Sequence, residues 1–306
     1  MLNETARGVF TIAATPFADN GDLDISSLNR MTDFYLEKGA TGLTILGMMG
    51  EAGKLSAQEA MDVVTTVVSR APVPIVVGVS AAGFAPMRAL AVAAMDAGAS
   101  GVMVAPPHTL KTDAQIVSYY HGVAEALGNI PFVLQDFPLV TNVVVPVSVI
   151  LQIVNDCPTC VMLKHEDWPG LDKISALRAA SDAGARRISI LCGNGGLYLP
   201  EELARGADGA MTGFSYPEMM AQVVMAHEAG DEARARDIFD AYLPLARYEG
   251  QPGIGLAIRK HILFQRGAIA SPKVRSPGPV ISPAGYREIQ RLIARQDEKL
   301  KALSLG

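Results

Sequence analysis

Short, continuous hydrophobic runs alternate with longer amphipathic stretches along most of the chain. Each run has four to six residues rich in Val, Ile or Leu, and it lacks the alternating polar positions of a strand with one exposed face. Such runs are typical of strands that are covered on both faces, as in a parallel sheet. The expected strands are residues 9–14, 42–46, 74–79, 101–105, 131–135, 160–164, 188–192 and 209–212.

The stretches between the runs have helical periodicity, and capping residues mark some of their ends. Residues 26–39 begin with Ser26 or Ser27 as the expected N-cap and end at Gly39. Residues 56–71 begin with Ser56 and carry Glu59 three positions later, which is a capping box. Further helices are expected at residues 85–97, 113–127, 146–155, 171–180, 197–205 and 217–228.

Eight strand–helix units within residues 1–230 predict an α/β fold, a (β/α)8 TIM barrel. A doubly wound open sheet is the alternative, but the glycine fingerprint of that fold is missing after the first strand, where residues 13–16 read AATP. Beyond residue 230 the strand pattern stops and three helical patterns follow. We therefore expect residues 231–306 to form a C-terminal three-helix appendage packed on the barrel.

Composition and charge exclude several classes of protein. The net charge is −5, and no block of Lys and Arg occurs, so the chain has no electrostatic footprint for nucleic acid or an anionic membrane. No apolar run approaches the roughly 20 residues that span a bilayer, and the N-terminus lacks the pattern of a secretory signal. These features predict a cytoplasmic protein.

The three cysteines do not form a disulfide framework. Cys157 and Cys160 have the C-x-x-C spacing of redox and zinc sites, but there is no second pair. We expect buried free thiols instead. The five histidines are scattered along the chain and form no ligand pair, so no metal site is predicted and a metal-dependent enzyme has little support.

Lys164 ends the sixth hydrophobic run, where lysine is unusual. Active sites of (β/α)8 barrels lie at the carboxyl ends of the strands. An amine that faces the barrel axis loses hydration, which lowers its pKa and allows it to attack a carbonyl and form an imine. The alternative is a lysine that faces the outer helices and reaches solvent, or that pairs with Glu166 or Asp167.

A glycine-rich segment follows the second expected strand. Gly47 and Gly50 bracket Met48 and Met49, whose backbone N–H groups could form a nest for a carboxylate. The alternative is a strand-to-helix turn without a ligand.

Taken in order, these segments resemble the dihydrodipicolinate synthase / N-acetylneuraminate lyase family of Schiff-base aldolases. GMMGEAGKLS (residues 47–56) resembles the segment that binds the carboxylate of pyruvate in that family, and VMLKHED (161–167) resembles the strand with the imine-forming lysine. LCGNGG (191–196) and GADGAMTG (206–213) resemble two later motifs.

The resemblance implies a lyase that acts on pyruvate or a related 2-oxo acid through an imine on Lys164, without an organic cofactor. It also implies a homo-oligomer, a dimer or a tetramer, and an aldehyde as partner substrate in an aldol reaction. Substrate contacts are implied for Gly47, Met48, Met49, Gly50, Gly193 and Met211.

The chain departs from the family where protons are transferred. Gln135 stands in place of the usual tyrosine, and glutamine cannot donate and recover a proton near neutral pH. Met48 replaces a relay hydroxyl, His108 falls where a second tyrosine is usual, and Val140 replaces an arginine that binds the second substrate. The synthase relay therefore cannot operate unchanged.

Other residues must then supply the acid and base. Lys164, Gln135 and His108 are the predicted catalytic residues. His108 is favoured because its loop is expected to overhang the barrel mouth and because its ordinary pKa is near 6.5. Asp136, expected to point outward and cap a turn near Asn142, and His165 are further candidates.

The remaining acids near these segments are expected to have other roles. Glu51 is expected to accept the backbone hydrogen bonds of its own loop. Glu166 and Asp167 are expected to face away from Lys164, because inward carboxylates would raise the pKa of the amine.

Several reactions stay open. Aldol cleavage or condensation and dehydration of a 3-deoxy-2-oxo sugar acid are all compatible with a lysine imine. The alternative from another class is a non-catalytic 2-oxo-acid-binding protein on a degenerate aldolase scaffold.

Overall fold

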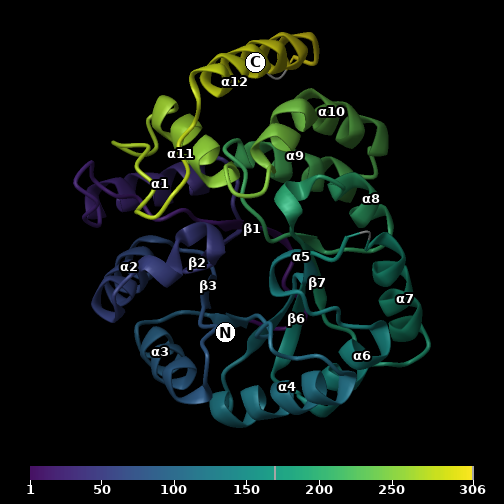
Figure 1. The fold of residues 1–306 in the computed structure, drawn as a ribbon. Coiled ribbons are helices and arrows are strands. Elements are labelled where there is room, and N and C mark those ends of the chain that lie inside the picture. The colour runs from purple at the N-terminus through teal and green to yellow at the C-terminus, as the bar shows by residue number, and fades with distance from the viewer. Residues whose placement is uncertain (169, 305–306) are drawn as a thin grey trace.

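Eight parallel strands close into a barrel in the computed structural model, which describes residues 1–168 and 170–304 (Figure 1). Neighbouring strands follow the chain order, and β1 pairs with β8 to complete the ring. The predicted (β/α)8 fold is confirmed, and the open doubly wound sheet is excluded. The strands are β1 (Gly8–Ile12), β2 (Gly42–Ile45), β3 (Ile75–Gly78), β4 (Gly101–Val104), β5 (Phe132–Asp136), β6 (Cys160–His165), β7 (Ser189–Cys192) and β8 (Gly209–Ala210).

Helices surround the barrel and short helical turns lie in the loops at its mouth, by which we mean the end where the carboxyl ends of the strands lie. The outer helices are α1 (Ile25–Glu37), α2 (Ala57–Arg70), α3 (Phe84–Asp96), α4 (Asp113–Leu127), α6 (Val147–Asp156), α7 (Leu171–Asp182), α8 (Leu199–Ala204) and α9 (Pro217–Glu228). The mouth carries η1 (Met48–Gly50) and η2 (Ala52–Lys54) after β2, α5 (Pro138–Thr141) after β5, and η3 (Asn194–Gly196) after β7.

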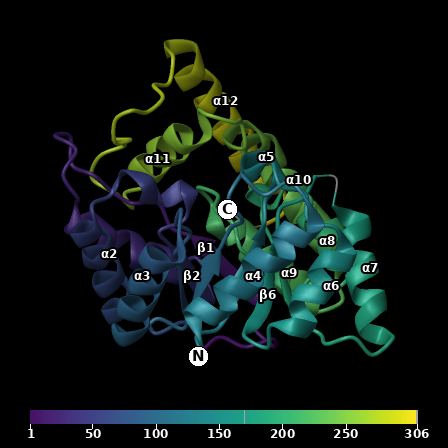
Figure 2. The same ribbon diagram turned by 60° about the horizontal axis from the view of Figure 1, so that its bottom comes forward.

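Three further helices follow the barrel, namely α10 (Glu232–Glu249), α11 (Gly255–Gln265) and α12 (Pro283–Ala302). Helix α10 packs along α9, and α12 packs against α10. In Figure 2, α5, α11 and part of α12 lie toward the upper end of the molecule, on the side where the loops of the mouth lie. Within the described residues, none of the helices combines the length and the apolar character needed to cross a membrane.

The N-termini of α1 and α2 differ in how well the local sequence predicted their N-cap residues. The capping box of α2 is present as predicted, with Ser56 and Glu59 bonded to each other's backbone. The predicted N-cap of α1 is wrong, because Asp24 takes that place and accepts a hydrogen bond from the Ser27 N–H at 2.9 Å. The Ser27 hydroxyl instead accepts a hydrogen bond from the N–H of Ala270.

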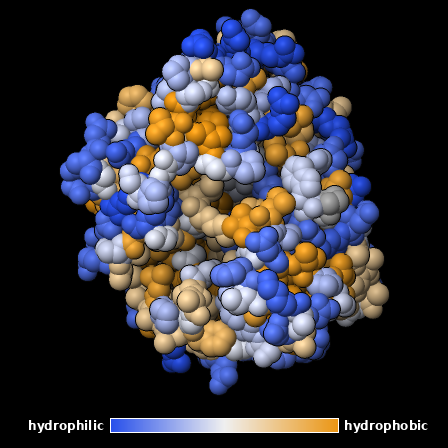
Figure 3. All heavy atoms as spheres, viewed as in Figure 1, coloured by the Kyte–Doolittle hydropathy of each residue, from blue (hydrophilic) through white to orange (hydrophobic). Residues whose placement is uncertain are grey.

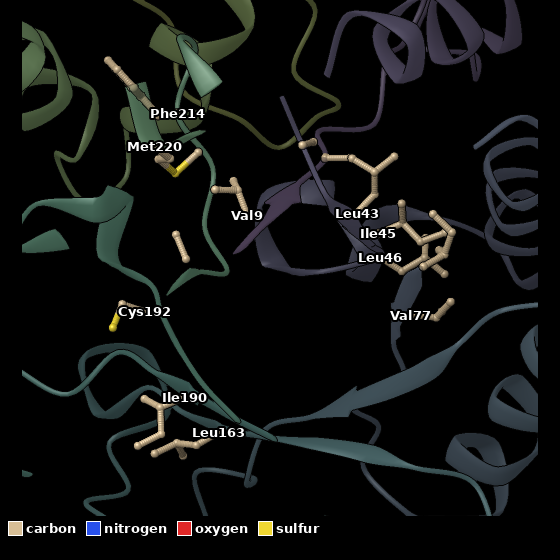
Figure 4. Close-up of a cluster of buried hydrophobic side chains, with 14 of the residues drawn as sticks. Val9, Leu43, Ile45, Leu46, Val77, Leu163, Ile190, Cys192, Phe214 and Met220 are labelled. Carbon is tan, nitrogen blue, oxygen red and sulfur yellow. The ribbon is translucent and has the colours of Figure 1, made fainter. Parts of the chain in front are cut away.

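Two apolar layers fix which way each strand residue points. The larger layer fills the space between the strands and the helices, and Leu163 belongs to it (Figure 4). The smaller layer fills the barrel interior and includes Met162 and Val133. Because side chains alternate along a strand, Lys164 and Gln135 follow Met162 and Val133 into the barrel.

The cysteines are free and buried, as predicted. Cys160 is enclosed in the layer outside the barrel, where burial raises the pKa of its thiol to about 12. A protonated, enclosed thiol behaves as a small apolar side chain.

Candidate active site

Lys164 points into the barrel near its mouth. The side chain is buried, with the residue only 5% exposed, and its backbone pairs in register with Gln135 of β5 and Leu191 of β7. The Nζ atom lies 2.9 Å from Oε2 of Glu166. The outward orientation considered above is therefore excluded, although the pairing with Glu166 is present.

Glu166 faces Lys164, and the expectation that it faces away is wrong. Strand β6 ends at His165, and the Glu166 N–H donates to the Asp136 carbonyl at 2.9 Å, which continues the ladder with β5 for one more residue. Glu166 is two positions beyond Lys164, so this extension brings both side chains to the same face. Gln135 donates from Nε2 to Oε2 of Glu166 at 2.7 Å.

Gly193 supplies the space that Glu166 occupies. A Cβ atom on Gly193 would lie 2.1 Å from Cγ of Glu166 and 2.5 Å from its Oε1. Asn194, the next residue, donates from its side chain to the Glu166 carbonyl at 3.0 Å. The loop after β7 thus holds Glu166 from one side, while Gln135 holds it from the other.

Asp136 lies on the opposite side of β5 from Gln135 and does not reach Lys164. Its Oδ2 atom pairs with Nζ of Lys173 at 2.7 Å, and Lys173 also contacts Asp167 at 2.6 Å. Burial raises the pKa of Asp136 to about 6, while the Lys173 ammonium lowers it. The predicted outward direction is confirmed, but its partner is Lys173 rather than a turn near Asn142.

His165 also points out of the barrel. A Cβ atom on Gly170 would lie 2.3 Å from its Nε2, so the imidazole packs directly against that glycine. Burial, reinforced by the Lys173 ammonium, lowers the pKa of His165 to about 4. The ring is neutral at pH 7 and lies on the face of β6 opposite to Lys164.

His108 is exposed on the loop after β4. Its backbone carbonyl accepts a hydrogen bond from Lys111, whereas its ring has no hydrogen-bond or ion-pair partner among residues 1–168 and 170–304. The structure brings Lys164, Gln135 and Glu166 together and leaves His108 outside that group.

The glycine-bracketed loop forms the turn η1 beside the barrel interior. The N–H groups of Gly50 and Glu51 donate to Gly47 and Met48 respectively. Those of Met48 and Met49 have no acceptor within the described part of the chain, as expected for an anion-binding nest.

Contacts of Met49 and Gly50 hold this turn at the mouth of the barrel. Met49 packs against the interior layer, and Met48 is 44% exposed. The Thr15 hydroxyl donates to the Gly50 carbonyl and fixes the far end of the turn.

Among the described residues, the Glu51 carboxylate accepts no backbone hydrogen bond from its own loop, contrary to expectation. Its carboxylate contacts Nζ of Lys260 at 2.5 Å and Nζ of Lys54 at 2.8 Å, and it accepts from the N–H of Arg275 at 3.0 Å. Two of these donors belong to the C-terminal region, which no local pattern around the loop could reveal.

The remaining predicted substrate residues differ in their surroundings. Met211 is fully buried in the interior layer of the barrel, below the loops of the mouth. Val140 is exposed on α5, where it offers no charge to a second substrate.

Figure 3 views the mouth and shows a hollow near the middle of this face, bordered in part by hydrophobic side chains. Among the described residues, no group of three His, Cys, Asp or Glu side chains could hold a metal ion.

Comparison with known proteins extends over nearly the whole chain. Residues 5–296 match the dihydrodipicolinate synthetase family. The chain is 29% identical over 306 residues to an L-2-keto-3-deoxyarabonate dehydratase from Azospirillum brasilense, and the match covers 95% of this chain and 94% of that protein. It is 30% identical over 253 residues to a 4-hydroxy-tetrahydrodipicolinate synthase from Thiobacillus denitrificans, covering 79% of this chain and 81% of that protein.

Solved structures give the same result. A crystal structure described as dihydrodipicolinate synthase from Rhodopseudomonas palustris superimposes with a TM-score of 0.95 and 52% sequence identity, covering 96% of this chain and 99% of that chain. A putative dihydrodipicolinate synthetase from Pseudomonas aeruginosa has a TM-score of 0.87 and 27% identity, covering 95% and 99% of the two chains.

Proposed function

Because this chain belongs to the dihydrodipicolinate synthetase family, we propose that it is a lyase that dehydrates 3-deoxy-2-oxo sugar acids through an imine on Lys164. The observation that carries this proposal is the buried carboxylate of Glu166, 2.9 Å from Nζ of Lys164 and hydrogen-bonded to Gln135. This carboxylate can supply the proton transfer that the resemblance assigns to a tyrosine at the position of Gln135.

The first step joins the substrate to the enzyme. The amine of Lys164 attacks the C2 carbonyl, and loss of water from the adduct forms the imine. The carboxylate of the substrate would rest on the N–H groups of Met48 and Met49, which have no acceptor among the described residues. This contact would orient C3 toward the carboxylate of Glu166.

Glu166 then acts as base and acid. Its carboxylate takes a proton from C3, and the electron pair of the C–H bond moves into the enamine while the imine nitrogen accepts the charge. The enamine expels the hydroxyl group of C4 as a new C3–C4 double bond forms. Glu166 returns its proton to that hydroxyl, which leaves as water, and hydrolysis of the imine releases the product and restores Lys164.

Gln135 holds Glu166 during this cycle. Its amide N–H donates to Oε2 of Glu166, and glutamine does not compete for the proton because it does not titrate near neutral pH. A tyrosine at this position would add a second acid. The substitution thus fits a reaction in which one carboxylate moves the proton.

The lengths of the matches also favour dehydration. The dehydratase from Azospirillum brasilense aligns over 95% of this chain, whereas the synthase from Thiobacillus denitrificans aligns over 79%. Both are near 30% identical, so identity alone does not separate the two reactions.

Condensation of pyruvate with an aldehyde is the second candidate. It is favoured by the 52% identity to the structure from Rhodopseudomonas palustris that is described as dihydrodipicolinate synthase. The uncharged Val140, where the resemblance places an arginine, argues against a second substrate with a carboxylate. The comparisons give no support to a non-catalytic binding protein.

The other properties of the proposed enzyme follow from the imine and from the composition. The imine is its own electron sink, so no cofactor is needed. We propose a cytoplasmic homo-oligomer, in keeping with the three free, buried cysteines, which are typical of a reducing compartment, and with the family resemblance.

Product analysis tests the proposed reaction. The purified protein is incubated with 3-deoxy-2-oxo pentonates and hexonates, and the products are identified by mass spectrometry. Dehydration predicts a product about 18 Da lighter than the substrate, without release of pyruvate, and Lys164→Arg should abolish it. Release of pyruvate and an aldehyde would instead establish aldol cleavage.

A further inference from the structure

Glu51 has a strained backbone immediately after the η1 turn. Its φ is 54° and its ψ is 31°, a left-handed conformation that is uncommon for residues other than glycine. Such a conformation persists where surrounding contacts hold it in place. The Glu51 N–H donates to the Met48 carbonyl at 3.0 Å and so closes the turn that carries the open N–H groups of Met48 and Met49. Contacts that hold Glu51 therefore also hold this turn.

Lys260 is the most enclosed of the groups that hold Glu51. Its side chain is fully buried in α11, and its Nζ atom donates to Glu51 and to the Lys273 carbonyl at 2.8 Å. The ammonium also lies 4.5 Å from the centre of the Phe17 ring, within range of a cation–π contact. Burial lowers the pKa of Lys260 to about 8, and the Glu51 carboxylate opposes that shift.

The C-terminal segment that follows α11 adds to the same contact. The Arg275 N–H donates to Glu51, and its carbonyl accepts from Nζ of Lys54 at 2.7 Å. The Arg275 guanidinium pairs with Glu59 at the start of α2. Thus residues more than 200 positions apart in the chain enclose the single carboxylate next to the η1 turn.

A purely stabilising ion pair would not need to lie beside this turn. Buried ion pairs add little net stability, because desolvation of both charges offsets their attraction. Helix α11 carries a second buried pair, Arg259 with Glu249, and that pair binds the backbone of Gly213 and Ser215 rather than η1. The position of Lys260 beside η1 therefore indicates a role in this turn rather than in stability alone.

We propose that Lys260 is a positioning residue for the substrate carboxylate: it holds Glu51 and so keeps the N–H groups of Met48 and Met49 directed into the mouth of the barrel. This inference rests on the proposed function, which places the carboxylate of a 2-oxo acid at those groups. Lys260 itself contacts neither the substrate nor Lys164 in this account.

Removal of the ammonium should weaken carboxylate binding and spare imine formation. Lys260→Met keeps most of the length of the side chain and removes its charge. Glu51 would then keep only Lys54 and the Arg275 N–H, and the left-handed turn would relax. Small misplacements of groups that bind substrate change affinity or rate by roughly 10-fold to 100-fold.

The test measures how pyruvate labels Lys164 in the presence of borohydride. The rate of labelling is recorded against pyruvate concentration for the wild type, Lys260→Met and Arg266→Met. Arg266 follows α11 and pairs with Glu218 of α9, away from η1, so its variant is the matched control. Hydroxyacetone, a ketone without a carboxylate, is the second probe.

Lys260→Met should raise the half-saturating pyruvate concentration by roughly tenfold, while the labelling rate at saturation and the rate with hydroxyacetone stay within about twofold of the wild type. Arg266→Met should leave all three values unchanged. A half-saturating concentration equal to that of the wild type, or equal losses with pyruvate and hydroxyacetone, would overturn the proposal.

A second variant covers a failure of Lys260→Met to fold. Glu51→Gln removes the partner charge from the same pair and should give the same selective rise for pyruvate; an unchanged value would overturn the proposal. A wild type that pyruvate does not label would overturn the proposed function and this inference together. A labelled wild type with unaffected variants overturns this inference alone.

Discussion

The Nζ atom of Lys164 lies 2.9 Å from Oε2 of Glu166, and both side chains are buried at the mouth of the barrel. The contact joins the residue proposed to form the imine to a group that can carry a proton. It exists because β6 and its continuation keep the two residues on one face, and because Gly193 leaves room for the carboxylate.

Glu166→Gln separates imine formation from turnover. The variant keeps the size of the side chain but cannot take a proton from C3. General acid–base groups contribute about 10²-fold to 10⁴-fold, so we expect turnover to fall by roughly 100-fold or more. Pyruvate and borohydride should still label Lys164, as mass spectrometry would show. Turnover within twofold of the wild type would exclude Glu166 as the base.

Gly193→Ala tests the role of Glu166 by displacing its carboxylate. The new methyl group would lie 2.1 Å from Cγ of Glu166, and φ of Gly193, −104°, is outside the left-handed region. The carboxylate must move, so turnover should fall by roughly 100-fold without a change in fold. Gly83→Ala, where a Cβ meets open space, is the control and should retain activity. Equal activity of the two variants would contradict this assignment.

Gln135→Leu tests how Glu166 is held. Leucine keeps the volume but cannot donate to Oε2 of Glu166, so the carboxylate loses one of its two contacts described here. We expect kcat to fall by about tenfold, since a misdirected base transfers protons less efficiently. Steady-state kinetics on a substrate that the wild type dehydrates provides the measurement. An unchanged kcat would show that Gln135 has no such role.

The neutral His165 predicts a pH dependence of stability. Its folded-state pKa is about 4 against an ordinary value of 6.5, because the ring is buried and close to Lys173. Between these values the unfolded chain binds a proton and the folded chain does not. The neutral ring therefore makes its full contribution to the free energy of unfolding above pH 6.5. As the pH falls toward 4, the free energy of unfolding decreases by on the order of 3 kcal/mol.

Urea unfolding of the wild type and His165→Gln from pH 7.5 to pH 4 measures this contribution. The wild type should lose more stability than the variant as the pH falls below 6.5. Asp136, whose pKa is raised to about 6, gains a proton in the same range, but it is present in both proteins and cancels from the difference. Parallel curves would show that the imidazole is not held neutral.

The barrel and its lysine could be predicted from the sequence because both depend on local repetition. Continuous hydrophobic runs show strands buried on both faces, and alternation from Met162 predicts that Lys164 points inward. The orientation of Glu166 could have been found in the same way, by continuing the alternation beyond the strand. The opposite orientation was expected because an inward carboxylate raises the pKa of the amine. A buried ammonium, however, requires a counter-charge.

Other features of the site depend on contacts that the sequence does not show. Glu51 meets Lys260 across 209 positions, and Asp136 meets Lys173 across 37 positions. Pairings of this kind form only once the barrel closes and the C-terminal helices dock. The role expected for His108 rested on its ordinary pKa and on the expected place of its loop over the barrel mouth. The residue is exposed, and its ring has no partner in the group among the described residues.

Reductive labelling tests whether Lys164 forms the imine. The protein is treated with pyruvate and borohydride, digested and analysed by mass spectrometry, with Lys164→Arg as the control. We expect a mass increase of about 72 Da on the peptide that contains Lys164, and none in the control. Absence of an adduct with pyruvate and with every 3-deoxy-2-oxo sugar acid tested, or an adduct on another lysine, would contradict the central claim.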